Sequence, residues 1–250
     1  MRRYDHRLQW VSEKDKGQAD AVNKGLRKTS GEIIGWLNSD DVYYPGAIHA
    51  VCEFFSSHPE IDVVYGDANH IDEQDNVIEP YYTETWDLER LKDVCYLCQP
   101  AVFFRRSMVE RFGMLDERLH YCMDYEYWLR LGLGGVRVGH LKRVLAGSRF
   151  YAETKTLGAR IKVHQEIIRM MRERLGQVPD RWIFNYAHAV LEEKGFNRKN
   201  RFRFALAVST LSLCAAFRWN ARIPRSMLRT VGRWVGGNWP NKLFVGAVRK

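Results

Sequence analysis

The 250-residue chain lacks any apolar run of the roughly 18–20 residues that a membrane-spanning helix needs. Its first nine residues are charged rather than apolar, which is not the pattern of a signal peptide. Five cysteines without a regular framework do not suggest a disulfide scaffold, so a reduced, cytoplasmic setting is the simplest interpretation. With 46% hydrophobic residues, the composition excludes a disordered chain.

Acidic residues are missing from the last 57 positions. Residues 1–193 hold all 30 Asp and Glu against 26 Lys and Arg, a net charge of −4, whereas residues 194–250 carry +13. This division indicates a mildly acidic body that holds the chemistry and a basic tail that meets an anionic partner. Nucleic acid is not the expected partner, because no nucleic-acid motif accompanies the basic residues and the body is acidic.

The body alternates segments that are typical of strands and helices. Apolar runs bounded by turn residues predict strands, and apolar residues at three-four spacing predict helices. The alternation indicates an α/β domain with a mixed sheet. The predicted strands cover 33–37, 62–65, 101–104 and 136–138, with a turn at Gly66-Asp67 and a polar hairpin over 68–80 that turns at Asp75-Asn76. The predicted helices cover 18–28, 47–55 with Pro45 at the first helical position, and 125–131.

After residue 154 the pattern becomes helical. One predicted helix carries an apolar stripe from Ile161 to Met171, and another runs from about 181 to 193 and stops at Gly195. From Asn197 the chain alternates arginine with Phe, Leu and Trp. Its apolar stretch 204–217 is too short to span a bilayer, but the composition fits an interfacial helix on anionic lipid. A helical extension packed on the body is the alternative.

Asp40 and Asp41 stand directly after an apolar run, behind Asn38 and Ser39. Adjacent carboxylates at the carboxyl end of a buried strand cost free energy unless something offsets their charge. A divalent cation would do so, and ligands in open α/β sheets bind at that end of the strands. The alternative is a solvated turn with a helix cap, because Asp and Asn are common in turns.

Asp124 begins a second acidic cluster, which leads into a predicted helix. At a helix start it could be an N-cap. It could equally be a general base at the sheet end, held in place by the helix that Trp128 packs. The residues alone leave both interpretations open.

Five blocks of sequence carry a family resemblance. They are residues 15–25, residues 31–41 ending in Asn38-Ser39-Asp40-Asp41, residues 63–67, residues 99–106 and residues 124–130. In this order and spacing they resemble bacterial family 2 glycosyltransferases of the GT-A fold, over about residues 10–156. Such a resemblance is specific for the family and weak for the substrate.

The resemblance implies a nucleotide-sugar donor and a divalent metal, Mg or Mn. Asp40 and Asp41 match the metal and nucleotide motif that is often written DxD. Asp41 would bind the metal, and Asp40 would lie on the ribose or also on the metal. Asn38 would lie on the donor side, where many relatives have an acid.

The same resemblance implies roles for the other blocks. Asp124 matches the catalytic base that deprotonates the acceptor hydroxyl in an inverting displacement. Asp20 and Asn23 match a block that lines the nucleotide, with a polar helix face as the alternative. Asp67 and Gln99 match blocks near the acceptor or the donor sugar, with a structural turn role as the alternative.

Two departures from the family pattern stand out. The family usually begins with a strand, a nucleobase-reading segment and a second strand, and this chain starts where the family is already some way into its domain. A truncated chain with an exposed sheet edge is therefore expected. The second departure is Tyr151 after Arg149-Phe150, where many relatives have a histidine that assists the metal or diphosphate.

The sequence thus predicts an incomplete GT-A mixed sheet over residues 1–156, a helical extension over 157–196 and a basic, aromatic-rich tail over 197–250. The predicted function is sugar transfer from a nucleotide-sugar to a glycan or lipid-linked acceptor, in cell-surface polysaccharide or glycolipid synthesis. The expected location is cytoplasmic, with the tail on the anionic inner face of the cell membrane. The alternative is a catalytically inactive remnant that acts as a binding or membrane-attached module.

Overall fold

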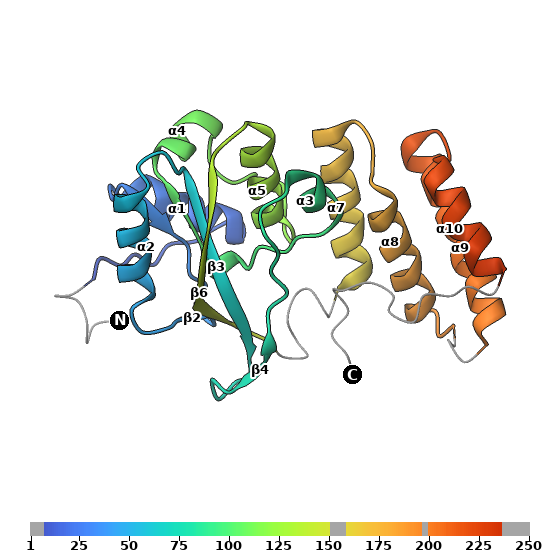
Figure 1. Ribbon diagram of the computed structural model, residues 1–250, viewed down its shortest axis with the longest axis horizontal. Coiled ribbons are helices and arrows are strands. Elements are labelled where there is room, and N and C mark those ends of the chain that lie inside the picture. Colours follow the sequence, from blue (N-terminus) through green and yellow to red (C-terminus); the bar gives the residue numbers. More distant parts are fainter. Residues whose placement is uncertain (1–7, 151–158, 197–199, 237–250) are drawn as a thin grey trace.

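The computed structural model describes residues 8–150, 159–196 and 200–236. Figure 1 shows a sheet flanked by helices at one end of an elongated molecule and a row of long helices toward the other end. The chain passes through these parts in order, from the sheet to the helices. An α/β body followed by a helical extension, as the sequence predicts, is therefore present.

A six-stranded mixed sheet forms the centre of the body. The strand order is β1-β5-β3-β6-β2, and β4 pairs with β3. Among the described strand pairs β3 and β6 are parallel, and the other pairs are antiparallel. The predicted mixed sheet is confirmed. Its strands are β1 (Ile33–Gly35), β2 (Val42–Tyr43), β3 (Val63–Ile71), β4 (Val77–Pro80), β5 (Val102–Arg105) and β6 (Val138–Arg149).

Helices cover both faces of this sheet. Val63 and Tyr65 of β3 join the core beneath the helices that follow the strands, while Val64 between them packs on the opposite side with Val51. This division follows from the alternation of side chains along a strand. The body contains α1 (Gln18–Lys28), α2 (Ala47–Ser57), α3 (Leu88–Asp93), the short 3₁₀ helix η2 (Gln99–Ala101), α4 (Ser107–Phe112) and α5 (Met123–Leu133).

Gly66 corrects one sequence prediction. Instead of turning the chain, it continues β3, and the pairing of β3 with β6 shifts register around Asp67. A Cβ atom on Gly66 would lie 2.4 Å from the side chain of Leu145 on the neighbouring strand. Glycine is needed here for the close approach of two strands, and the irregular pairing is typical of a β-bulge.

Two further predictions need correction. Pro45 lies before Gly46, the N-cap of α2, so it precedes the helix instead of opening it. The strand expected at 136–138 is the long β6, which begins at Val138 and runs to Arg149. Its pairing with β3 and β2 maintains an extended conformation through residues that have no strand-like alternation.

Four long helices form the C-terminal row. They are α7 (Arg160–Leu175), α8 (Asp180–Glu193), α9 (Arg201–Asn220) and α10 (Arg225–Val235). Trp234 packs on Phe184 with ring centroids 4.7 Å apart, and Phe204 packs on His188 at 5.5 Å. The packing alternative for the tail is thus correct for one face of α9 and α10. None of the described helices is both long enough and apolar enough to cross a bilayer.

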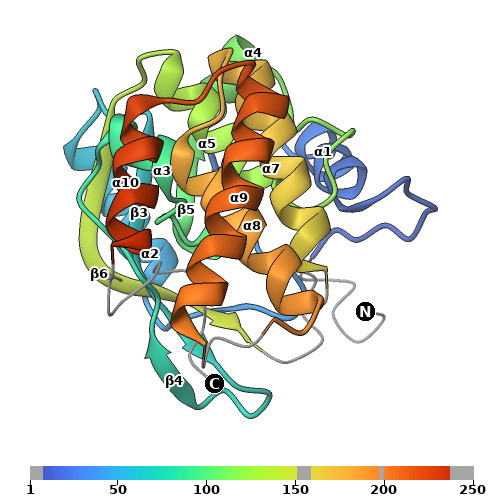
Figure 2. The same ribbon diagram turned by 90° about the vertical axis from the view of Figure 1, so that its right-hand side faces the viewer.

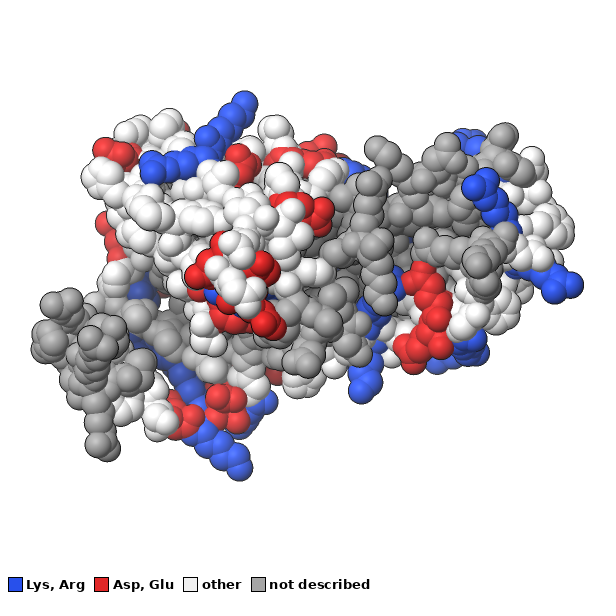
Figure 3. All heavy atoms as spheres, turned by 90° about the horizontal axis from the view of Figure 1, so that it is seen from below, with Lys and Arg blue, Asp and Glu red and all other residues white. Residues whose placement is uncertain are grey.

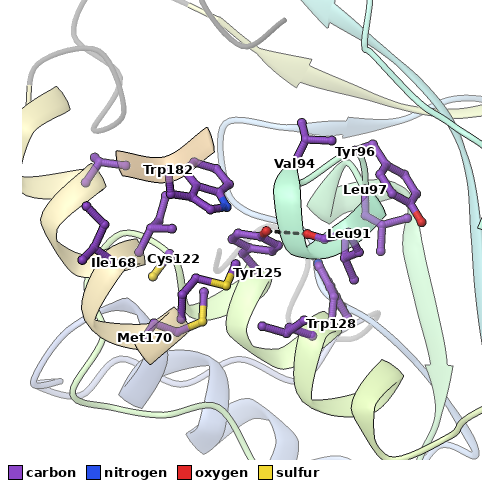
Figure 4. Packing of buried hydrophobic residues seen from close by; sticks show 14 of the residues in the cluster. Leu91, Val94, Tyr96, Leu97, Cys122, Tyr125, Trp128, Ile168, Met170 and Trp182 are labelled. Atoms are coloured by element: carbon purple, nitrogen blue, oxygen red, sulfur yellow. Dashed lines mark hydrogen bonds between the residues drawn. The ribbon is translucent and has the colours of Figure 1, made fainter. Parts of the chain in front are cut away.

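One hydrophobic cluster joins the body to this row. It extends from Ala19 on α1 through Trp128 on α5 to Trp234 on α10. Figure 4 shows its middle part, where Tyr125 and Trp182 lie side by side and the hydroxyl of Tyr125 donates to the carbonyl of Leu91. The helix that carries Asp124 is therefore packed from both the sheet and the C-terminal helices.

Candidate active site

The turn after β1 holds the first acidic cluster. The backbone N–H of Asp41 donates to the carbonyl of Asn38 at 3.2 Å, which closes the turn before β2 begins. No helix starts here, since α2 has Gly46 as its N-cap. The helix-cap part of the alternative interpretation of this cluster is therefore wrong, and the turn itself is present.

Asn38 is the centre of a hydrogen-bond network in this turn. Its Oδ1 accepts from Gln18 Nε2 at 2.9 Å and from Trp36 Nε1 at 3.0 Å. Its Nδ2 donates to Gln99 Oε1 at 2.8 Å and to Asp41 Oδ2 at 3.3 Å. Gln99 in turn donates to the carbonyl of Trp36. The network fixes the direction of the Asp41 carboxylate and brings three sequence-predicted residues together.

Asp41 carries a charge that its surroundings do not neutralise. Burial raises the pKa of the Asp41 carboxyl, and the neighbouring Asp40 charge adds to the rise. The backbone N–H of Arg149 donates to Asp41 Oδ1 at 2.9 Å. The Arg149 guanidinium, however, binds the carbonyl of Asp40 and forms an ion pair with Asp75 at 2.6 Å. Among the described residues, no basic side chain forms an ion pair with Asp41.

The donor set of this turn suits a cation that brings further oxygen ligands with it. No group of three His, Cys, Asp or Glu side chains that could hold a metal occurs within the described ranges. Asp40 and Asp41 would therefore supply at most two carboxylates, as Mg and Mn sites shared with phosphate oxygens do. The raised pKa of Asp41 is consistent with a position where a cation would relieve repulsion.

Asp124 lies in the first turn of α5 but does not cap it. The N-cap is Cys122, which makes no capping hydrogen bond through its side chain. The Asp124 carboxylate accepts from the adjacent Tyr125 N–H at 2.8 Å. The cap interpretation is therefore wrong. Burial raises the pKa of Asp124 above the usual range for aspartate, and no basic group offsets that effect. A partly exposed, unpaired carboxylate with a raised pKa suits a general base.

Residues 95–99 lie close to both acidic clusters. Burial raises the pKa of the Cys98 thiol, and the charges of both Asp41 and Asp124 raise it further. The same thiol thus lies within electrostatic range of both carboxylates, and the adjacent Gln99 is bonded to Asn38. Asn38, Asp41, Gln99 and Asp124 therefore gather around one segment.

Glu166 of α7 is a contributor that the sequence did not reveal. Its buried carboxylate, 3% exposed, accepts the backbone N–H of Tyr121 at 2.6 Å and of Cys122 at 3.0 Å. It also accepts the N–H of His120. These bonds hold the segment that leads into Asp124. No local pattern in the sequence indicated this role, since Glu166 lies off the apolar stripe that runs from Ile161 to Met171.

Asp20 and Asn23 lie on α1, where their polar groups serve the fold. Asp20 forms an ion pair with Lys24 at 3.2 Å, and the N–H of Lys16 lowers its pKa. Asn23 is 2% exposed, and its amide both donates to and accepts from the backbone of Leu115. Gln18 instead connects α1 to the site through Asn38.

Asp67 is separate from the Asn38 network in its described contacts. It pairs with His140 Nε2 at 2.9 Å, and the His140 ring stacks on Tyr65 at 4.5 Å. Its side chain is 40% exposed, so one side remains open to solvent. Tyr151, the departure noted in the sequence, lies outside the described residues.

Part of the chain that carries this site matches the sequence model of a protein family. Residues 2–113 match the sequence model of glycosyl transferase family 2. Over these residues, somewhat less than half of its length, the chain is similar to glycosyl transferase family 2. The match includes Asn38, Asp40, Asp41 and Gln99, and it ends before Asp124.

Curated relatives of low identity are named as glycosyltransferases or for a glycan pathway. An O-antigen biosynthesis protein of Myxococcus xanthus is 27% identical over 52% of this chain and 10% of its own length. An uncharacterized glycosyltransferase of Rickettsia prowazekii is 27% identical over 61% of this chain and 50% of its own length. A Mycobacterium bovis glycosyltransferase of PGL/p-HBAD biosynthesis is 29% identical over 46% of this chain. The chain spans half or less of these relatives.

A solved structure supports the fold. The S. aureus TarS 1–349 structure in complex with UDP-GlcNAc superposes with a TM-score of 0.57 at 14% identity, covering 98% of this chain and 80% of that one. The family match and this structural neighbour together confirm the GT-A fold that the sequence predicts.

Proposed function

We propose that the protein transfers a sugar from a nucleotide-sugar donor to an acceptor hydroxyl by an inverting displacement. The observation that supports the proposal is that Asp41 and Asp124, two acids with raised pKa values, both act electrostatically on the Cys98 thiol. One acid lies in the family-matched turn, and the other is free to take a proton. The match of residues 2–113 to glycosyl transferase family 2 supports the reaction class.

In the proposed mechanism Asp124 accepts the proton of the acceptor hydroxyl while the acceptor oxygen bonds to the anomeric carbon. The bond between that carbon and the diphosphate oxygen breaks, and the electron pair leaves with the diphosphate. Because attack and departure occur on opposite faces, the anomeric configuration inverts. Asn38 and Gln99 hold the turn that faces the leaving group.

A divalent cation, Mg or Mn, fits the carboxylates of Asp40 and Asp41 and would supply positive charge to offset the leaving diphosphate. Asp40 would also lie near the ribose. Asp67, whose side chain is 40% exposed, would contribute to the sugar or acceptor side. Asp20 and Asn23 would affect the donor side through the position of α1, since their own groups are occupied.

We propose a glycan or lipid-linked acceptor, used in the synthesis of cell-surface polysaccharide or glycolipid. Two relatives are named for such pathways, O-antigen and PGL/p-HBAD biosynthesis. The proposed location is the cytoplasm, at the inner face of the cell membrane.

A donor panel tests the proposal. The purified chain is titrated with UDP- and GDP-sugars in the presence of Mn²⁺, and release of nucleoside diphosphate is followed with added acceptor glycans. We expect one donor to bind and to be turned over, with inverted configuration in the product by NMR. Binding without turnover would favour the inactive binding module. Absence of binding to every donor would overturn the proposal.

A further inference from the structure

The outer face of α9 is apolar although nothing in the described chain covers it. Phe202 is 62% exposed, Leu206 50% and Phe217 65%. With Thr210 and the half-buried Leu213, these residues follow three-four spacing and form one line along the helix. From Phe202 to Phe217 the line is about 22 Å long at 1.5 Å per residue. We call these five residues the α9 stripe.

The opposite face of α9 is already occupied. Phe204, Ala205, Val208 and Ala216 are buried in the continuous hydrophobic cluster, against α8. The helix is therefore apolar on two sides, one of which faces outward. Exposed apolar faces of this extent usually mark an interaction site.

The neighbouring α10 adds charge to the same end of the molecule. Figure 2 views this end directly and shows α9 and α10 side by side in front of the other helices. Arg225, Arg229 and Arg233 are exposed and recur every fourth residue along one face of α10. Arg229 and Arg233 flank a shallow hollow that Gly232 and Gly236 also line.

The charge of this end has one sign. Residues 200–236 contain seven arginines and no Asp, Glu or Lys. In Figure 3, seen from below, the charged atoms at the right-hand tip are blue, and acidic atoms gather nearer the middle of that face. We define the end face as the α9 stripe together with Leu228, Val235 and the arginines of residues 200–236.

We infer that the end face docks on an anionic lipid bilayer, with α9 and α10 lying in the plane of the headgroups. The α9 stripe would enter the boundary between headgroups and acyl chains, and the arginines would pair with lipid phosphates. The partner follows from charge complementarity. A second copy would bring the seven arginines of one chain close to the seven of the other, and like charges repel. A nucleic acid would leave the apolar Phe and Leu side chains uncovered. Residues 237–250 add Lys242, Arg249 and Lys250 and no acid, so they too would be repelled.

Vesicle binding without donor tests this inference independently of sugar transfer. The chain is centrifuged with phosphatidylcholine vesicles, with or without 30% phosphatidylglycerol, at low and high salt. We expect binding only to the anionic vesicles, weakened by salt. Equal binding to both kinds of vesicle, or no binding to either, would overturn the inference. Transfer to a soluble acceptor without vesicles is measured separately and tests the proposed function.

Two surface variants separate charge from apolar insertion. The triple change Arg225→Gln, Arg229→Gln and Arg233→Gln should weaken partitioning roughly 100-fold, at about 1 kcal/mol for each arginine. Changing Phe202, Leu206 and Phe217 to Ser should weaken it at least about ten-fold. Val77→Ser with Ile78→Ser on β4, equally exposed, is the apolar control and should leave binding unchanged. Thermal unfolding confirms that each variant is folded.

Two other occupants of the end face, and one other segment that could contact the membrane, give distinct results. A dimer in light scattering that the stripe variant abolishes would assign the end face to a second copy. Tighter binding to an RNA oligonucleotide than to anionic vesicles, lost in the arginine variant only, would assign it to nucleic acid. Loss of vesicle binding on truncation after Gly236 would assign the membrane contact to residues 237–250. Each of these results would overturn the inference, and unchanged binding by the truncated chain supports it.

Discussion

Glu166 accepts a hydrogen bond at 3.0 Å from the backbone N–H of Cys122, the N-cap of the helix that carries Asp124. The acceptor belongs to the C-terminal helices and the donor to the sheet body. The position of the proposed base therefore depends on a side chain that lies 44 positions after the N-cap of its helix.

Glu166→Ala should lower both stability and turnover. It leaves three backbone N–H groups without their acceptor, of which that of Cys122 is buried, at a cost of about 1–3 kcal/mol. It also frees Asp124 to move, and a shift of about 1 Å can cost 100-fold in rate. Glu173→Ala on the same helix, whose carboxylate is 59% exposed, is the control and should cost less than about 1 kcal/mol. Denaturant unfolding and kcat measure the two effects, and similar results for both variants would contradict the role of Glu166.

Asp124→Asn should stabilise the protein while removing activity. Turnover should fall by about two to four orders of magnitude, the usual scale for a general base, with donor binding retained. The folded-state pKa of Asp124 is raised, so ionisation disfavours the folded state above that pKa. The Asn variant should therefore have the higher Tm at pH 7, and its advantage should disappear as the pH falls toward about 3.9. Glu60→Gln, at an exposed site, should change neither property. A lower Tm for the Asn variant at pH 7 would show that the charge is compensated.

The pH profile of kcat/KM offers a second check on Asp124. A general base must be ionised, so activity should be lost on the acidic side at a pH above the ordinary aspartate pKa of about 3.9. Burial is the cause of the shift. Asp41 also has a raised pKa, but saturating Mn²⁺ should keep it ionised. The acidic limb of the kcat/KM profile measured with Mn²⁺ should therefore report the ionisation of Asp124. A profile that is flat down to pH 4 would exclude Asp124 as the base.

Asp41→Asn should remove the stabilisation that Mn²⁺ and a nucleoside diphosphate give together. A ligand at 100 times its Kd contributes about 2.7 kcal/mol, which corresponds to roughly 5–10 °C in Tm for a protein of this size. The variant without ligand should remain folded, since it loses only a half-buried charge. Glu79→Gln on β4, which is exposed, should retain the full shift. An equal Mn²⁺-dependent shift in the Asp41 variant would remove the metal assignment.

Asn38→Asp tests the network in the turn. Aspartate retains the acceptor for Gln18 and Trp36 but loses the donor to Gln99 and Asp41, so the metal-free protein should lose about 1–3 kcal/mol. Because a third carboxylate would then face the cation, Mn²⁺ should restore the Tm of this variant. Asn38→Ala keeps Asp40 and Asp41 but gains no ligand, so it should be destabilised and Mn²⁺ should restore less of its Tm. Calorimetry with and without Mn²⁺ distinguishes the two, and equal recovery would argue against a metal at this turn.

Local sequence signals predicted the amphipathic and turn-bounded elements well. The helix expected over 18–28 is α1 with the same bounds, because one stripe of apolar residues faces the core. The expected turn at Asp75-Asn76 closes the β3–β4 hairpin, and Asp75 has a φ of +67°, which aspartate tolerates better than most residues.

Local sequence signals did not predict the elements that depend on contacts between residues distant in the sequence. Most of β6 was missed because Lys142 and Arg143 interrupt its pattern, and strand pairing overrides that local signal. The six-residue helices α3 and α4 are too short to show a helical period. Gly66 resembled a turn residue, whereas its role depends on Leu145 of another strand.

In the candidate site, too, the sequence revealed the local contacts and not those between distant residues. The adjacency of Asn38 and Asp41 is local and was visible in the sequence. The bond of Asn38 to Gln99 spans 61 positions, and the bond of Asn23 to Leu115 spans 92. No single-sequence pattern distinguishes an asparagine that supports a loop from one that contacts a ligand. The roles of Asn23 and Glu166 therefore emerged only from the structure.

The hydrophobic cluster that runs from Ala19 to Trp234 has a consequence for how the protein unfolds. Two segments that share a core cannot melt independently without exposing each other's apolar surface, so heating should give a single calorimetric peak. Amide hydrogens in the middle of α8 should exchange as slowly as those of β3. Cutting the chain after residue 196 would uncover Phe184 and His188, which Trp234 and Phe204 now cover. The shortened protein should aggregate, because the last helices form part of the interior that the sheet body needs in order to stay folded.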